Sequence, residues 1–323
     1  MARKLTRMAI AYDFDGTLAP GNMQEHSFIP ELKLSIKDFW SEVKQIAKNQ
    51  DMDEILAYMH LMLKCADASQ VQILKKSFYK HGQKIELFRG VKEWFPRLDN
   101  YARDRGVKLE HYIISSGLRE MVAGTPIAKR FSYIFASGFY YDQNSVATWP
   151  ALAVNYTTKT QYLFRINKGI LNSYDNTQIN KFVPEEDRDI PFTHMAYIGD
   201  GETDVPCMKM IKYQGGCAIA VYNPNKRGSK HKKSSKDIAL ELLEQKRADY
   251  ACPTDYTDGS SLDLLMKAFI DRVAATDRMK QVQTSKRINT SPSRILLQAG
   301  EAPNEIKKEL SNEATSSTHM NAI

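Results

Sequence analysis

The chain has 323 residues, of which 42% are hydrophobic, and its formal net charge is +7. A chain of this length and composition can bury a sizeable core, as one large domain with an insertion or as two domains. It contains no run of about 20 apolar residues, which a membrane-spanning helix needs, and its four cysteines have neither zinc-site nor disulfide-framework spacing. We therefore expect a cytoplasmic protein without a membrane partner.

The first expected strand is the apolar run 8–12, whose length and pattern are typical of a strand buried on both faces. It is followed directly by "DFDGT", in which Asp13 and Asp15 flank a phenylalanine. A buried strand needs no acidic residue at its end. The two aspartates, which point to the same side of an extended chain, therefore indicate a functional site.

Residues from His26 to about Lys84 are helical in character, with stretches such as "ELKLSIKDFWSEVKQIAKN". This segment is too long for a crossover helix between two strands, so we expect an inserted helical module above the sheet. We call this module, residues 21–84, the cap.

From residue 85 onward, strands alternate with helices. The expected strands cover residues 109–117, 133–142, 147–156, 193–201 and 215–223. The expected helices cover residues 117–131, with a break near Pro126, and 158–174. This alternation is typical of an α/β fold with a Rossmann-like parallel sheet and helices on both faces. Residues 1–20 and 85–275 would form that core.

Residues 276–323 are poor in aromatics and rich in Ser, Thr, Asn and charge, which is typical of a disordered or loosely helical tail. A second unusual stretch, "NKRGSKHKKSSK" at 225–236, is basic without a single acid. Because it follows the strand 215–223, we expect it near the entrance of the site, either steering an anionic substrate or as a solvated loop. The residues concerned are Lys226, Arg227, Lys230, Lys232 and Lys233.

Polar or small residues follow three of the expected strands: Asp13 and Asp15, Ser115 and Ser116, and Asp200 and Asp204. Ligands of open α/β sheets bind beyond the carboxyl ends of the strands, so these groups should converge. At about 4 Å and an effective dielectric near 20, each pair of like charges costs roughly 4 kcal/mol, and the carboxylates therefore need a cation. Oxygen ligands suit Mg²⁺ better than zinc.

Four ordered motifs resemble those of the haloacid dehalogenase (HAD) superfamily of phosphotransferases. They are "DFDGT", the strand-end serine of "YIISSG", the lysine of "TTKTQYLF" and "GDGETD". The resemblance covers roughly residues 8–270. The position of the insert, between the first and second motifs, is similar to that of the phosphoserine phosphatase-like branch with a helical cap.

The resemblance implies roles for the acidic residues. Asp13 would be the nucleophile that forms an aspartyl-phosphate, and Asp15 would protonate the leaving oxygen and then activate water. An acid at the second position favours a phosphatase over dehalogenases and ion-pumping ATPases of the superfamily. Mg²⁺ would be held by Asp13, Asp200 and the backbone carbonyl of Asp15, with Asp204 as a ligand or a support.

The resemblance also implies a phosphate cradle of Ser115, Ser116, Gly117 and Lys159. We favour Ser115 over Ser116 because it directly follows the apolar run. Lys168 competes with Lys159 for the lysine role, and we favour Lys159 because the family lysine opens its helix. A serine that caps the following helix and a lysine that is simply solvated are the structural alternatives.

The implied function is hydrolysis of a small phosphorylated metabolite. The alternatives are a non-catalytic phosphate-sensing module with the same fold, and a phosphatase acting on nucleotides or nucleic-acid ends. A sensing module is expected to lose a motif acid, and none is missing here. The sequence lacks a basic groove interleaved with aromatics, so nucleic acid is not an expected partner. No pattern identifies the substrate or the oligomeric state.

Overall fold

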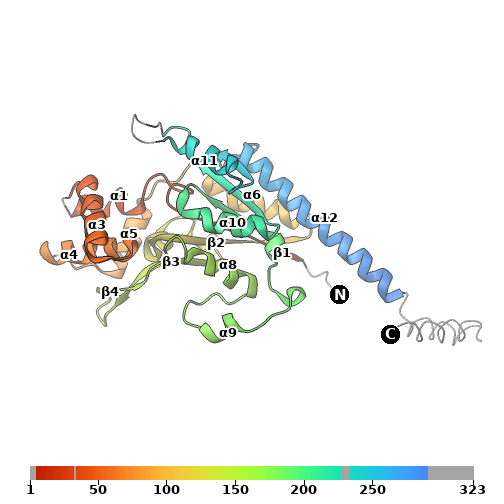
Figure 1. Cartoon of the computed structure of the whole chain (residues 1–323), viewed down its shortest axis with the longest axis horizontal. Helices are drawn as coiled ribbons and strands as arrows, with labels where there is room; N and C mark the ends of the chain where they lie inside the picture. Colours follow the sequence, from red (N-terminus) through yellow and green to blue (C-terminus); the bar gives the residue numbers. More distant parts are fainter. Residues whose placement is uncertain (1–4, 33, 71, 227, 229–232, 290–323) are drawn as a thin grey trace, which may run out of the picture. The chain divides into compact units, whose positions relative to one another are not determined.

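Figure 1 shows the computed structural model, which describes residues 5–32, 34–70, 72–226, 228 and 233–289. One compact unit ends at Asp271, and a second begins at Arg272. Among the described helices, none is long and apolar enough to cross a membrane. The four cysteines are free, as their spacing predicts.

A seven-stranded sheet forms the centre of the first unit, in the order β4-β3-β2-β1-β5-β6-β7. The strands are β1 (Thr6–Tyr12), β2 (Val107–Leu118), β3 (Tyr133–Tyr141), β4 (Ala147–Leu152), β5 (Met195–Gly199), β6 (Cys217–Tyr222) and β7 (Tyr250–Pro253). All neighbouring strands pair in parallel except β3 and β4, which are antiparallel. The predicted α/β fold with a parallel sheet is confirmed. The strand expected at 147–156 is the edge strand β4, which is shorter and antiparallel, and the short strand β7 is an addition to the expectation.

Helices cover both faces of this sheet. On one face, alternate residues of the central strands, such as Ala9, Ala11 and Ile114, pack with α8 (Lys159–Lys168) and α10 (Val205–Tyr213). On the other face, Tyr12 contacts the aromatic side chains of α6 (Val91–Arg103). Burial on both faces explains why Met8–Tyr12 is apolar throughout.

The remaining helices complete the described architecture. They are α1 (Met23–His26), α2 (Phe28–Glu31), α3 (Ile36–Gln50), α4 (Glu54–Ala68), α5 (Lys75–Gln83), α7 (Arg119–Gly124), α9 (Asn176–Asn180), α11 (Ser235–Glu244) and α12 (Ser261–Asn289). Short 3₁₀ turns occur at Ala128–Arg130, Glu185–Asp187, Phe192–His194 and Glu202–Asp204.

The segment between β1 and α6 is helical, as the sequence predicts. Helices α1, α3, α4 and α5 gather at one end of the sheet, beside β3 and β4 (Figure 1). Ser35 caps the start of α3, and Asp53 caps the start of α4 through its Oδ1, which accepts hydrogen bonds from two backbone N–H groups. Local sequence signals therefore set the start of two helices in this inserted module.

Two expected boundaries differ from the structure. The helix predicted for 158–174 ends at Lys168, because Gly169 adopts a left-handed conformation with φ of +71° and terminates it. The predicted tail begins inside α12, which runs without interruption from Ser261 to Asn289. Residues 276–289 are thus helical, and residues 290–323 lie outside the described part of the chain.

Candidate active site

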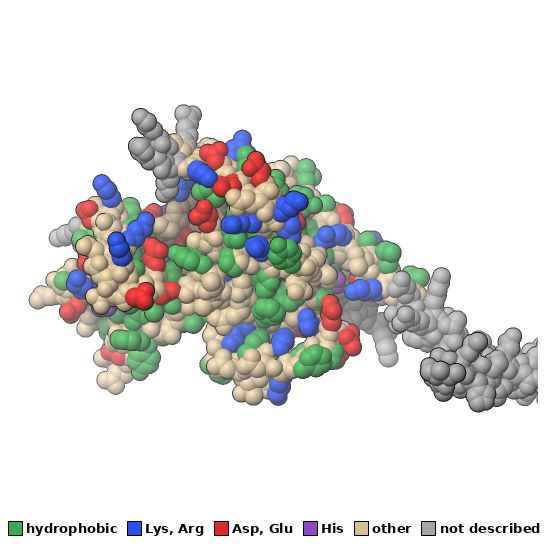
Figure 2. Space-filling model, in the orientation of Figure 1, with side chains coloured by type: hydrophobic (Ala, Val, Ile, Leu, Met, Phe, Trp, Pro, Cys, Tyr) green, Lys and Arg blue, Asp and Glu red, His purple; other side chains and the backbone are tan. Residues whose placement is uncertain are grey.

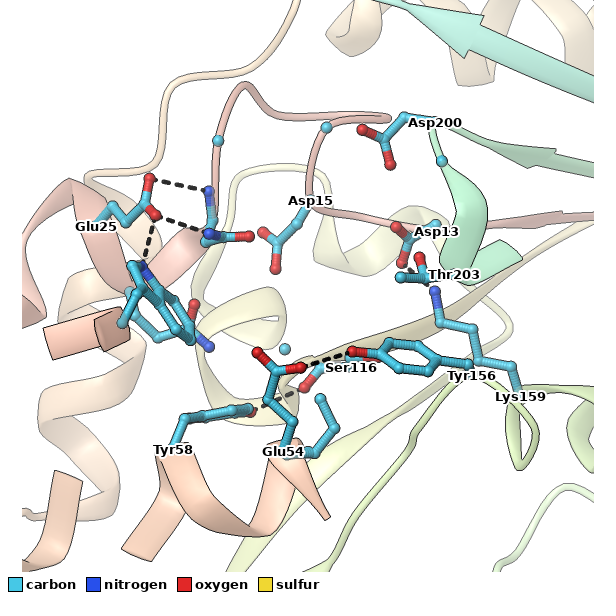
Figure 3. A pocket seen from close by; sticks show the side chains of 18 of the residues that line it. Asp13, Asp15, Glu25, Glu54, Tyr58, Ser116, Tyr156, Lys159, Asp200 and Thr203 are labelled. Atoms are coloured by element: carbon cyan, nitrogen blue, oxygen red, sulfur yellow. Dashed lines mark hydrogen bonds and ion pairs between the residues drawn. The ribbon is translucent and has the colours of Figure 1, made fainter. Parts of the chain in front are cut away.

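The acidic residues lie where the central strands end. Asp13 follows β1, and its backbone N–H donates to the carbonyl of Ile198 in β5 at 2.9 Å. Asp200 follows β5 directly. Figure 3 shows Asp13, Asp15 and Asp200 at one side of a cavity, with Lys159 beside Asp13. Parallel pairing of β1 with β5 therefore brings together acids that are far apart in the sequence.

Lys159 is the cation of this cluster. Its Nζ donates to Asp13 Oδ1 at 2.9 Å and to Asp204 Oδ1 at 2.7 Å, and the side chain is 1% exposed. Lys168 instead donates to the backbone carbonyls of Ile179 and Lys181, at 2.6 and 2.7 Å. The structure thus places Lys159 at the acids and Lys168 outside the cavity lining.

Burial dominates the electrostatics of the cluster. It raises the pKa of Asp13 to about 6, against the lowering effect of Lys159. Burial and the charge of Asp13 raise the pKa values of Asp15 and Asp200 well above their ordinary range. The pKa of Lys159 is raised because its two carboxylate neighbours outweigh the cost of its burial. The positive charges of the described residues therefore do not fully balance the negative charge of these acids.

Two glycines let the backbone approach these carboxylates. A Cβ on Gly16 would lie 2.0 Å from Asp200 Oδ2, and Gly16 also has a φ of +75°. A Cβ on Gly199 would lie 2.4 Å from Asp204 Oδ2. A Cβ at either of these two positions would displace a carboxylate of the cluster, and the positive φ of Gly16 also favours glycine there.

The donor set fits a hard divalent cation. One carboxylate oxygen from each of Asp13, Asp200 and Asp204 lies within 4.8 Å of the others. Asp204 is fully buried, with Oδ1 accepting from Lys159 and from Tyr197 Oη at 2.7 Å, whereas its Oδ2 has no hydrogen-bond partner among the described residues. An oxygen-only cluster with an unsatisfied buried carboxylate oxygen is suited to Mg²⁺.

The two adjacent serines are placed differently. Ser115 is fully buried, and its Oγ accepts from the backbone N–H of Gly117 at 3.0 Å. Ser116 and Gly117 line the cavity, and Ser116 Oγ has no partner among the described residues. The pairing of β2 with β3 shifts register between Ser115 and Leu118, so an irregularity turns residues 116 and 117 towards the cavity. The cavity lining therefore includes Ser116 and not Ser115, and which of the two serines binds phosphate stays a prediction.

The cavity has a volume of about 570 Å³ and is completed by the cap and by the loop before α8. The sequence did not indicate the following lining residues as site residues: Gly21, Asn22, Gln24, Glu25, Lys44, Glu54, Ile55, Tyr156 and Thr203. Trp40 and Tyr58 of the cap also line it. Helical periodicity marks the buried face of α4 but does not distinguish core from cavity, so no sequence signal identifies this wall.

Hydrogen bonds join the cap to the edge of the sheet that carries the acids. Asp15 Oδ1 accepts from the backbone N–H of Met23 in α1 at 2.9 Å. Tyr58 Oη in α4 donates to the carbonyl of Ser116 at 2.8 Å. Asn155, in the loop before Lys159, donates to Asp53 Oδ2 at 2.7 Å. The cap therefore contacts three of the segments that carry the motifs.

The basic stretch is only partly described. Lys226 lines the cavity, and Lys233 forms an ion pair with Glu241 of α11. Arg227, Lys230 and Lys232 lie outside the described residues. On the face drawn in Figure 2, basic and acidic side chains are interspersed over the described part of the molecule.

Residues 10–209 match the family described as haloacid dehalogenase-like hydrolase. An uncharacterized protein of Borreliella burgdorferi is 28% identical over 282 residues, 79% of this chain and 93% of that protein. A probable phosphoserine phosphatase from Vibrio cholerae superimposes with a TM-score of 0.51 at 13% identity, over 85% of this chain and 67% of that one. A HAD family hydrolase from Salmonella enterica serovar Typhi gives a TM-score of 0.49 at 16% identity, over 81% and 71% of the two chains.

Proposed function

The chain belongs to the haloacid dehalogenase-like hydrolase family, as its motifs predict, and on that premise we propose that it is a Mg²⁺-dependent phosphatase. It hydrolyses a small phosphorylated metabolite through an aspartyl-phosphate. In this proposal residues 1–20 and 85–275 form the catalytic core, and the cap covers the bound substrate. One observation carries the proposal. Lys159 donates a hydrogen bond to Asp13, and both residues line the same cavity as Asp15.

The first step uses Asp13 and Asp15. A carboxylate oxygen of Asp13 attacks phosphorus, the bond from phosphorus to the ester oxygen breaks, and Asp15 donates its proton to the departing alkoxide. The cap backbone holds Asp15 Oδ1 through Met23, which orients the carboxyl group while Oδ2 faces the substrate. Lys159 holds Asp13 and balances phosphoryl charge.

In the second step Asp15 accepts a proton from water as that water attacks phosphorus of the aspartyl-phosphate. Asp13 is regenerated and inorganic phosphate leaves. Ser116 Oγ and the backbone N–H groups beside it bind phosphoryl oxygens, which supplies the partner that Ser116 Oγ lacks within the described protein. Asp13, Asp200 and the backbone carbonyl of Asp15 would hold Mg²⁺, supported by Asp204, and the ion would neutralise the charge gathered there.

Our first prediction tests the two aspartates separately. With p-nitrophenyl phosphate and Mg²⁺, Asp13→Asn should abolish turnover, because no covalent intermediate forms without the carboxylate. Asp15→Asn should lower kcat by about 10²- to 10⁴-fold. With acetyl phosphate, whose leaving group needs little protonation, Asp15→Asn should accumulate a phosphoenzyme that peptide mass spectrometry maps to Asp13.

Asp104→Asn is the matched control, because Asp104 is exposed at the end of α6 and outside the cavity lining. A label on Ser116 or on a histidine, or near-normal activity of Asp13→Asn, would refute the covalent mechanism. Phosphate binding without turnover by the unmodified protein would favour the sensing module.

A further inference from the structure

The side of the cavity that faces the acids has an unusual composition. Figure 3 shows Glu54, Tyr58 and Tyr156 together on this side and Asp200 on the opposite one. We call it the outer wall and define it by six lining residues that carry aromatic rings, carboxylates or an amide: Gln24, Glu25, Trp40, Glu54, Tyr58 and Tyr156. The phosphoryl group would occupy the opposite end, so the outer wall contacts the alcohol part of the substrate.

The aromatic rings of the outer wall are fixed in place. Trp40 Nε1 donates to Glu25 Oε1 at 2.8 Å, and its ring meets that of Tyr58 edge to face, with centroids 6.0 Å apart. Tyr156 Oη donates to Glu54 Oε2 at 3.1 Å. Ring faces carry negative electrostatic potential, so these rings beside two carboxylates form an environment that favours a cation.

Gln24 provides an independent indication. Its side chain lines the cavity and is 2% exposed, yet its Oε1 has no hydrogen-bond partner among the described residues. Tyr58 donates its proton to the carbonyl of Ser116, so it is not a donor to Gln24. The amide oxygen is therefore left as a buried acceptor, which needs an N–H or O–H donor from a ligand.

The charges of the described lining residues divide between the two ends of the cavity. Lys159 forms hydrogen-bonded ion pairs with the acids, and Lys226 lies near enough to Asp200 for its charge to oppose the rise of the Asp200 pKa. At the outer wall the two carboxylates Glu25 and Glu54 are accompanied only by the exposed Lys44. No arginine is among the described lining residues. The outer wall is thus net negative and provides no guanidinium for a carboxylate.

We propose that the substrate is the phosphate monoester of an alcohol that carries a positively charged nitrogen and no carboxylate. The phosphoryl group binds at Asp13, and the cationic nitrogen lies against Trp40, Tyr58 and Glu54 within reach of Gln24 Oε1. This inference rests on the proposed phosphatase function and adds the substrate class. An ammonium with N–H donors satisfies Gln24, so a primary amine is preferred to a quaternary one.

The experiment compares substrates that match in shape and differ in charge. With the full chain and Mg²⁺, kcat/KM is measured for choline phosphate against 3,3-dimethylbutyl phosphate, and for 2-aminoethyl phosphate against propyl phosphate. The cationic member of each pair should be preferred by about tenfold or more, and the primary amine should exceed the quaternary one. Phosphoserine, which adds a carboxylate to the ammonium, should be poorer than 2-aminoethyl phosphate.

Variants assign the preference to the outer wall. Glu54→Gln and Trp40→Leu should each reduce the ratio of kcat/KM between cationic and neutral substrates several-fold. Glu42→Gln is the control, because Glu42 is on the neighbouring helix α3, pairs with Lys64 and lies outside the lining. Equal kcat/KM for the members of each pair, with normal turnover of p-nitrophenyl phosphate, would overturn the substrate class alone. Absence of turnover on every phosphate ester would overturn the phosphatase function and this inference with it.

Discussion

At the scale of single residues, neighbours of the same type have different surroundings. Ser115 and Ser116 are consecutive, but the Ser115 hydroxyl is bonded inside the strand end, whereas the hydroxyl of Ser116, a residue that lines the cavity, has no partner in the described protein. In an extended chain, consecutive side chains point to opposite sides. We therefore propose that Ser115 is structural and that Ser116 binds the ligand.

Our prediction for this pair is a separation of stability from activity. Ser116→Ala should lower kcat/KM by about 10- to 100-fold, the effect of losing a hydrogen bond to a charged group. Its free energy of unfolding should hardly change. Ser115→Ala should lower the free energy of unfolding by about 1 kcal/mol, because Gly117 N–H loses its buried acceptor. Steady-state kinetics and urea unfolding of both variants check this, and the reverse assignment of effects would contradict it.

At the scale of elements, β1 and β2 are held together by an ion pair as well as by their ladder. Arg7 on β1 donates to both carboxylate oxygens of Glu110 on β2, at 2.8 and 2.9 Å, and also pairs with Asp189. Tyr112 Oη donates to Glu110 at 2.8 Å. Burial alone would raise the pKa of Glu110, but the hydrogen bonds from Arg7 and Tyr112 outweigh it and the pKa is lowered.

The sign of this shift predicts how stability depends on pH. A lowered pKa in the folded state stabilises the protein above the unfolded value of about 4.3, and the contribution is lost as pH falls through the folded value. Glu110→Gln should therefore reduce the free energy of unfolding by about 1 to 3 kcal/mol at pH 7 and by clearly less near pH 3.

Urea unfolding of both proteins at the two pH values measures the difference. Glu42→Gln removes an exposed pair with a distance of 3.3 Å to Lys64, and should change the free energy of unfolding by about 0.5 kcal/mol or less. An effect of Glu110→Gln that is the same at both pH values would show that the ion pair does not contribute as argued.

At the scale of the whole molecule, the proposed cation site can exist only when the sheet is formed. Asp13 follows β1, whereas Asp200 and Asp204 follow β5, and their carboxylates meet within 4.8 Å through the pairing of these strands. A cation that binds this cluster and not the unfolded chain must stabilise the fold.

We predict that Mg²⁺ raises the melting temperature of the protein by a few degrees, since a ligand at 100 times its Kd stabilises by about 2.7 kcal/mol. EDTA should remove both this shift and the phosphatase activity. Asp200→Asn should lose the shift while the protein remains folded, and Asp104→Asn should retain it. Thermal unfolding with and without Mg²⁺ measures this, and an identical shift in Asp200→Asn would exclude the proposed ligand set.

Much of this protein follows from local patterns in its sequence. The apolar run before Asp13, the strand and helix alternation after residue 85 and the helical insert each depend on neighbouring residues alone, so they are readable without a structure. The order of four motifs at strand and helix ends also identifies the family, because the carboxyl ends of parallel strands must meet. The outline of the fold and the acids of the candidate site were therefore predictable.

The tertiary structure decided which of several equivalent residues face the cavity. Lys159 and Lys168 stand at the two ends of α8, about 2.5 turns apart, so they point to opposite sides, and only the packing of α8 on the sheet brings Lys159 to Asp13. The irregular end of β2 turns Ser116 rather than Ser115 to the cavity. The outer wall joins side chains of α1, α3 and α4 to Tyr156, and their meeting depends on contacts between distant segments that no local pattern encodes.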